Sequence, residues 1–202
     1  PLNHTINRKA LKVEELESFS VPKSVITKLK SLGYEKLTEV QELAIKKGLF
    51  RGKNLVISAP TNTGKTFIGE LAALNASQRK DTARTFYLVP LKALAEEKFQ
   101  EFQEKYKDWG LEVAISTRDR NEFDDELLYH DLIIATYEKL NSLLVREPKI
   151  CEGIGVIIVD EIQYIGDYAR GVNLELLITR LIALREKKAP QILGLSETSP
   201  NA

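Results

Sequence analysis

The chain has 202 residues, of which 43% are hydrophobic and 29% are charged, an ordinary globular mixture that excludes a disordered or low-complexity protein. The 29 basic and 29 acidic residues cancel, so the net charge gives no sign of a nucleic-acid or membrane partner, although a local basic groove is compatible with it. A single cysteine, Cys151, excludes an internal disulfide, and the sequence has neither a membrane-spanning apolar run nor a signal-peptide core; we expect a cytoplasmic protein in a reducing compartment.

The first 50 residues differ from the rest and are expected to form a separate helical segment, followed by a main domain over residues 51–202. A short amphipathic helix is predicted to begin near Pro22 and to end at Gly33. A second helix is predicted from about Thr38, a suitable N-cap, to Phe50.

The main domain alternates short apolar runs with segments of helical spacing. The apolar runs barely alternate with polar residues, which is typical of strands covered on both faces. Strand–helix alternation predicts an α/β fold with a doubly wound, mostly parallel sheet flanked by helices, and ligands in such sheets bind beyond the carboxyl ends of the strands. The predicted strands are Asn54–Ala59, Thr85–Val89, Leu111–Ser116, Leu132–Thr136, Val156–Val159 and Ile192–Leu195.

A loop between the first predicted strand and the following helix has the pattern of a phosphate-binding loop. Backbone N–H groups at such a helix start point at phosphates, and Gly64 permits close approach of the backbone. Lys65 supplies a positive charge to the phosphates, and the hydroxyl of Thr66 suits a magnesium ion. We expect the loop to bind ATP through Ala59, Pro60, Thr61, Asn62, Thr63, Gly64, Lys65 and Thr66.

Two adjacent acids, Asp160 and Glu161, follow the buried run Val156–Val159. Carboxylates at the end of a buried strand are costly unless they serve a function. We expect Asp160 to hold Mg²⁺, through water, and Glu161 to orient and deprotonate the attacking water. Positioning and electrostatics would then carry the phosphoryl transfer.

These motifs, with the segment before them, resemble superfamily 2 helicases, and among these the Ski-type group that includes the archaeal Hjm-type DNA repair helicases. Residues 33–41 resemble the Q motif of that superfamily, which implies that the amide of Gln41 reads the adenine edge. Phe19 is a candidate to stack on the base, and packing in the core explains it equally well. The resemblance implies a RecA-like domain of the DEAD/DEAH type.

Further segments at successive strand ends resemble motifs that track the phosphate backbone of one nucleic-acid strand. A capped helix start is the alternative explanation for each of them. Arg170, in a stretch that the Ski-type group carries after its acidic motif, either pairs locally or touches nucleic acid. The resemblance assigns nucleic-acid contact to Pro90, Leu91, Lys92, Thr117, Arg118, Thr136, Glu138 and Arg170.

The sequence departs from these patterns at three positions. Ala59 stands where the general phosphate loop has Gly, and Gln163 stands where most Ski-type members have His after the acidic pair. Gln163 can still form hydrogen bonds near the γ-phosphate, but it does not change charge near neutral pH. Glu197 replaces the Ala of the Ser-Ala-Thr coupling motif, adding bulk and charge near the site, while Ser196 and Thr198 keep their hydroxyls.

In the family, the remaining arginines of the ATP site lie on a second RecA-like domain of the same parent protein. We therefore expect this chain to be the first motor domain of an ATP-dependent DNA helicase, poorly active by itself. The resemblance implies 3′→5′ movement on single-stranded or forked DNA in repair or replication. Two alternatives stay open: an RNA helicase of the same group, and a nucleotide-dependent interaction module that does not unwind.

Overall fold

The computed structural model describes residues 10–79, 83–117, 127, 129–168, 171–183 and 189–197. Within them lies a sheet of six parallel strands in the order β1-β6-β5-β2-β4-β3. The predicted α/β fold with a parallel sheet is therefore confirmed. The strands are β1 (Leu55–Ala59), β2 (Arg84–Val89), β3 (Val113–Ser116), β4 (Leu132–Thr136), β5 (Ile154–Val159) and β6 (Gln191–Glu197).

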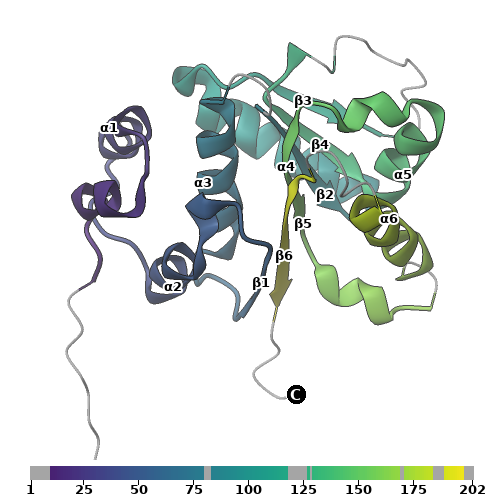
Figure 1. Cartoon of the computed structure of the whole chain (residues 1–202), viewed down its shortest axis with the longest axis horizontal. Coiled ribbons are helices and arrows are strands. Elements are labelled where there is room, and N and C mark those ends of the chain that lie inside the picture. The colour runs from purple at the N-terminus through teal and green to yellow at the C-terminus, as the bar shows by residue number, and fades with distance from the viewer. Residues whose placement is uncertain are drawn as a thin grey trace, which may run out of the picture.

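Helices cover both faces of this sheet (Figure 1). The chain advances across the sheet from β1 to β2 and from β2 to β3, and it returns from β4 to β5 and from β5 to β6. Because parallel crossovers are right-handed, the outward and the returning helices lie on opposite faces. One face carries α3 (Lys65–Ser77) and α4 (Lys92–Tyr106), and the other carries α5 (Tyr137–Arg146) and α6 (Gly171–Ala183).

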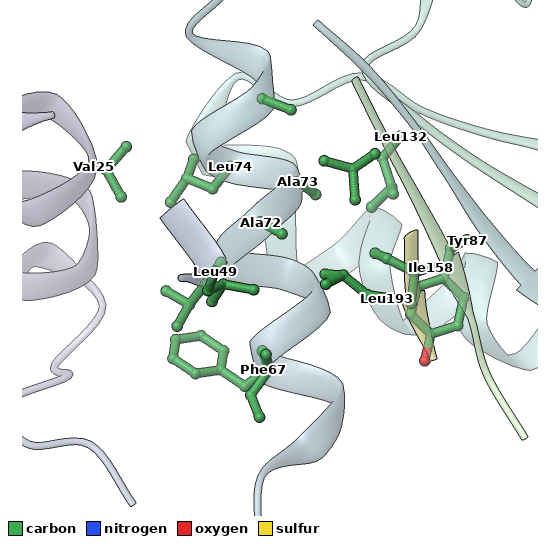
Figure 2. Close-up of a cluster of buried hydrophobic side chains, with 14 of the residues drawn as sticks. Val25, Leu49, Phe67, Ala72, Ala73, Leu74, Tyr87, Leu132, Ile158 and Leu193 are labelled. Atoms are coloured by element: carbon green, nitrogen blue, oxygen red, sulfur yellow. The ribbon is translucent and has the colours of Figure 1, made fainter. Parts of the chain in front are cut away.

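The strands alternate their side chains between two hydrophobic cores. In β2, Tyr87 and Val89 join the core under α3 and α4, whereas Phe86 and Leu88 join the core under α5 and α6. Figure 2 shows part of the first core, in which Phe67 of α3 lies below Leu49 on one side of the helix, and Tyr87 lies with Ile158 and Leu193 on the other side. Burial on both faces explains why the strand sequences are almost continuously apolar.

The N-terminal segment packs against the first core. Thr38 caps the second of its helices, as predicted, because its hydroxyl oxygen accepts the backbone N–H of Gln41 at 3.4 Å. That helix ends at Lys47 rather than at the predicted Phe50, because Gly48 has a φ of 112° and turns the chain out of the helical path. The segment comprises η1 (Val13–Phe19), α1 (Lys23–Ser31), α2 (Glu39–Lys47) and η2 (Leu49–Arg51).

Three further short helices lie near strand ends: η3 (Lys107–Trp109), η5 (Pro148–Cys151) and η6 (Ile162–Gly166). The last of them follows the acidic pair and leads toward α6. In the part of the chain that the structure describes, every helix is too short or too polar to cross a bilayer.

A buried carboxylate joins α3 to α4. The side chain of Glu70 in α3 is only 4% exposed, and its Oε2 lies 2.5 Å from Nζ of Lys105 in α4. The hydroxyl of Tyr106 donates to the same oxygen. The ammonium of Lys105 lies 5.3 Å from the ring centre of Phe67, which stacks on Tyr34 with ring centres 4.3 Å apart. This cluster fastens the helix of the phosphate loop to α4 and to the segment before α2.

We expect Glu70→Ala to lower the free energy of unfolding by about 2–4 kcal/mol, because it leaves the Lys105 ammonium and the Tyr106 hydroxyl without their buried acceptor. Urea denaturation followed by circular dichroism measures the change. The matched control is Glu17→Ala, which removes an exposed partner of Lys23. Its effect should stay below ~0.5 kcal/mol. Equal effects of the two substitutions would contradict a role for Glu70 in fastening the helices.

Candidate active site

The predicted phosphate loop lies between β1 and α3, beyond the carboxyl end of the strand. Gly64 adopts a φ of 85°, and a Cβ atom built there would lie 2.3 Å from Nε2 of Gln41. Glycine is therefore required both by the left-handed backbone and by the amide packed against it. The N-cap residue of α3 is Gly64, which has no side chain that could accept the backbone N–H groups of the first turn. The helix N-terminus thus presents backbone N–H groups to an anion.

A pocket of about 450 Å³ lies at this helix end. Lys65 is 9% exposed, and its Nζ donates to the carbonyl oxygens of Ala59 at 2.6 Å and Pro60 at 3.0 Å. Two loop carbonyls thus hold the ammonium beside the pocket, where phosphate oxygens can replace them as acceptors. The pocket is lined by Thr61, Asn62, Gly64, Lys65, Thr66, Val89, Leu94, Lys98, Asp160, Glu161 and Glu197.

The acidic pair also lines this pocket. The carboxylate of Asp160 accepts the hydroxyl of Tyr87 at 2.6 Å and the backbone N–H of Glu161 at 3.0 Å. The backbone N–H of Asp160 donates to the carbonyl oxygen of Leu88 at 2.8 Å, which continues the pairing of β5 with β2. Glu161 has a φ of 56°, and its carboxylate accepts the side-chain amide of Gln163. Each of the two carboxylates is therefore held by its own hydrogen-bond donors.

Desolvation raises the pKa of both carboxyl groups above their ordinary values. For Asp160, burial outweighs the hydrogen bond from Tyr87 and the positive charge of Lys98, which lower the pKa. For Glu161, the negative charges of Asp160 and Glu197 add to the effect of burial, while the hydrogen bond from Gln163 opposes it. A raised pKa makes Glu161 a better proton acceptor than an ordinary carboxylate.

Gln41 lies beside the phosphate loop and is 6% exposed. Its Oε1 accepts the backbone N–H of Thr38 at 2.9 Å, and its Nε2 donates to the carbonyl oxygen of Gly64 at 3.2 Å. The Thr38 hydroxyl also donates to the carbonyl oxygen of Thr63 at 3.0 Å. The amide thus joins α2 to the loop, and contact with adenine stays a prediction. Phe19 is partly buried and packs against the first core.

Three of the segments predicted to meet nucleic acid lie at the carboxyl ends of the neighbouring strands β2, β4 and β3. Val89 pairs with Thr136, which brings the ends of β2 and β4 side by side. At the end of β2, Pro90 is buried, while Leu91 and Lys92 are exposed at the start of α4. Two backbone-tracking candidates, Leu91 and Lys92, are therefore accessible at this edge.

The two predicted threonines are less accessible. Thr117 is 2% exposed and Thr136 is 5% exposed. The hydroxyl oxygen of Thr136 accepts the backbone N–H of Lys139 at 3.3 Å and so caps α5, whereas Glu138 in the first turn is exposed. The side chain of Thr136 therefore caps a helix, which was the alternative explanation for this segment. Arg118, Arg170 and Thr198 lie outside the described residues, and Ser196 lies in β6.

Three residues of the site were not predicted from the sequence. Lys98 of α4 lines the pocket, and its side chain, 22% exposed, pairs with Glu101 at 2.8 Å. Its spacing of four residues from Leu94 places both on one helix face, which was the available signal. Tyr87 and Tyr137 hold the acidic pair, through the carboxylate and the backbone respectively. Their roles had no sequence signal, because their partners lie far along the chain.

A parallel sheet with a phosphate loop after β1 and an acidic pair after β5, both facing one pocket, defines a RecA-like nucleotide-binding domain. A family model described as DEAD/DEAH box helicase matches residues 38–202. The chain belongs to the DEAD/DEAH box helicase family, and the resemblance to superfamily 2 helicases is confirmed.

The similar proteins include several named ATP-dependent DNA helicase Hel308. The protein from Pyrococcus horikoshii is 43% identical over 194 residues, which are 95% of this chain and 25% of the relative. Those from Thermococcus kodakarensis and Methanocaldococcus jannaschii are 41% and 42% identical, and the matches cover 95% and 86% of this chain but 16% and 14% of the relatives. The chain therefore spans a quarter or less of the length of these relatives. It corresponds to a first RecA-like domain of the Hjm type.

We expect Glu197→Ala to extend ATP hydrolysis to lower pH. Removing the negative charge of Glu197 lowers the pKa of Glu161, so this carboxylate, which we expect to accept the proton of the attacking water, stays deprotonated as the pH falls. The acidic limb of kcat against pH, measured with the full-length protein, should move to lower pH. The control Glu112→Ala, at an exposed acid before β3, should leave the limb in place. A limb that does not move in Glu197→Ala would contradict this coupling.

Proposed function

We propose that this chain is the ATP-binding motor domain of an ATP-dependent DNA helicase. The observation that carries the proposal is the shared pocket: Lys65 and the acidic pair Asp160 and Glu161, which is far from Lys65 in the sequence, line one cavity at the carboxyl edge of the sheet. Support also comes from relatives that are named ATP-dependent DNA helicases and match most of this chain. We place the protein inside the cell, in a reducing compartment.

The nucleotide is proposed to lie with its phosphates at the N-terminus of α3. Lys65 would exchange its carbonyl partners for phosphate oxygens, and the free N–H groups of the helix would bind the same anion. The hydroxyl of Thr66 and the carboxylate of Asp160 line the same pocket, and this hard oxygen donor set fits Mg²⁺. When bound there, the ion neutralises charge on the phosphates.

Glu161 is proposed to take the proton of the attacking water. Its side chain lines the pocket next to the metal-binding acid, and its raised pKa suits a proton acceptor. Gln163 orients this carboxylate by donating a hydrogen bond to Oε2. Asp160 is less suited to the task, because each of its oxygens already accepts one hydrogen bond, from the Tyr87 hydroxyl or from the backbone N–H of Glu161, and the carboxylate is the proposed ligand of Mg²⁺.

The nucleic-acid strand is proposed to cross the ends of β2, β3 and β4. Lys92 is exposed at the start of α4, and the β2 segment that precedes it also carries Tyr87, which contacts the acidic pair. Strand tracking through phosphates does not itself distinguish DNA from RNA, so the preference for DNA rests on the relatives. We further propose 3′→5′ movement on single-stranded or forked DNA in repair or replication, together with a second RecA-like domain of the parent protein.

We expect single-stranded DNA to raise the ATP turnover of the full-length protein severalfold, and single-stranded RNA of the same sequence to raise it less. A coupled assay of ADP release measures both. Stimulation by RNA alone would reverse the choice of substrate.

We expect Lys65→Ala to weaken ATP binding by roughly 100-fold, because it removes two charge-assisted hydrogen bonds to the phosphates. Full ATP affinity in Lys65→Ala would refute the phosphate-loop assignment.

We expect Glu161→Gln to keep ATP affinity within about twofold of the wild type and to lower kcat by about 100-fold or more, because the amide cannot accept the proton of the water. Equilibrium binding of a fluorescent ATP analogue and single-turnover hydrolysis separate the two effects. Glu112→Gln, at an exposed glutamate before β3 that does not line the pocket, is the matched control. Unchanged hydrolysis in Glu161→Gln would assign the base to another group.

A further inference from the structure

The backbone at Glu161 has an unfavourable conformation for its residue type. Its φ of 56° and ψ of 43° lie in the left-handed helical region. A residue with a Cβ atom is disfavoured there by steric contact with its own backbone, and glutamate lacks the short side chain with which asparagine or aspartate relieves this strain. Such a conformation persists only where surrounding contacts enforce it. The contacts that hold this backbone therefore determine where the carboxylate of Glu161 lies.

One side chain contacts the backbone on both sides of this residue. The hydroxyl of Tyr137 donates to the carbonyl oxygen of Asp160 and lies 3.4 Å from the carbonyl oxygen of Glu161. These two carbonyls belong to the peptide groups that flank the Glu161 Cα atom. Tyr137 is 2% exposed, and its ring is part of the core under α5 and α6, so the hydroxyl has little freedom to move.

The position of Tyr137 in the chain gives this contact its significance. Tyr137 is the first residue of α5, directly after Thr136, which ends β4 and caps the helix. Thr136 pairs with Val89 at the end of β2, and Glu138 on the other side of Tyr137 is exposed. The hydroxyl therefore connects the acidic pair to the strand end at which we place nucleic acid.

We propose that Tyr137 is a positioning residue for hydrolysis: its buried hydroxyl holds the left-handed backbone of Glu161 and ties that carboxylate to the end of β4. This inference rests on the proposed function, since it assigns Tyr137 a task only if Glu161 activates water. Tyr87 has a different task, because its hydroxyl bonds the Asp160 carboxylate and makes no such contact with the backbone of Glu161.

The test is Tyr137→Phe in the full-length protein, with ATP hydrolysis measured at saturating single-stranded DNA. The ring stays in the core and only the hydroxyl is lost. We expect kcat to fall about tenfold, which corresponds to ~1.4 kcal/mol of transition-state stabilisation, with the KM for ATP changed less than about twofold. Tyr106→Phe is the matched control, because it also removes a buried tyrosine hydroxyl, but one whose acceptor, the carboxylate of Glu70, lies outside the pocket. It should leave kcat and KM unchanged.

A double variant separates positioning from a general effect on stability. If Tyr137 acts through Glu161, then Tyr137→Phe combined with Glu161→Gln should hydrolyse ATP in a single turnover as slowly as Glu161→Gln alone. A further loss of about tenfold in the double variant would show independent action and overturn the inference. An unchanged kcat in Tyr137→Phe, or a kcat lost equally in Tyr106→Phe, would also overturn it.

These results distinguish the inference from the proposed function. If the wild type hydrolyses ATP and Glu161→Gln does not, the proposed function stands, and Tyr137→Phe alone decides the role of Tyr137. If the wild type fails to hydrolyse ATP with any nucleic acid, both fall. Retained binding of the fluorescent ATP analogue by Tyr137→Phe shows that its pocket is folded, so a low kcat in that variant reports positioning.

Discussion

The hydrogen bond from the Tyr87 hydroxyl to the Asp160 carboxylate is the contact on which the site depends. A carboxylate withdrawn from water is costly unless donors replace the lost hydration. Tyr87 supplies one donor from inside the sheet, where it is fully buried, and the backbone N–H of Glu161 supplies the other. The register of β2 with β5 brings the donor into reach, because Tyr87 pairs with Ile158, two residues before Asp160. The acidic pair is therefore positioned by strand pairing as much as by its own loop.

The phosphate loop follows β1, at one edge of the sheet, and lines the same pocket as the acidic pair. β6 and β5 follow β1 in the sheet, and the pocket reaches as far as Val89 at the end of β2, so it spans the ends of four neighbouring strands. The N-terminal segment reinforces the loop, since Gln41 and Thr38 both bond carbonyl oxygens of the loop. Glu70 and Lys105 then fasten α3 to α4, which begins with the exposed Lys92. The helix that follows the phosphate loop is thus joined to the helix that begins at the proposed nucleic-acid edge.

The sequence was sufficient to predict the strands and the phosphate loop, because buried parallel strands and glycine-lysine turns have strong local patterns. It misplaced the end of α2, where the left-handed Gly48 ended a helix that the apolar spacing continued to Phe50. It could not assign tasks to Tyr87 or Tyr137, because a tyrosine in a buried strand or helix start looks like ordinary core. Their hydroxyl partners lie 73 and 23 residues away along the chain and become neighbours only in the folded sheet. The role of Thr136 was similarly open, since a helix cap and a phosphate contact use the same hydroxyl.

Two of the three departures from the sequence patterns, Gln163 and Glu197, act on the pKa of the same carboxylate, that of Glu161, in opposite directions. The amide of Gln163 donates to Glu161 and lowers its pKa, whereas the negative charge of Glu197 raises it. A histidine in place of Gln163 would favour the deprotonated base most strongly when it is itself protonated, so its influence would vary near neutral pH. The glutamine donates at every pH. Beside the effect of burial, the pKa of Glu161, the proposed base, thus reflects two opposing neighbours: a donor that does not titrate, and the negative charge of an acid exposed at the end of β6.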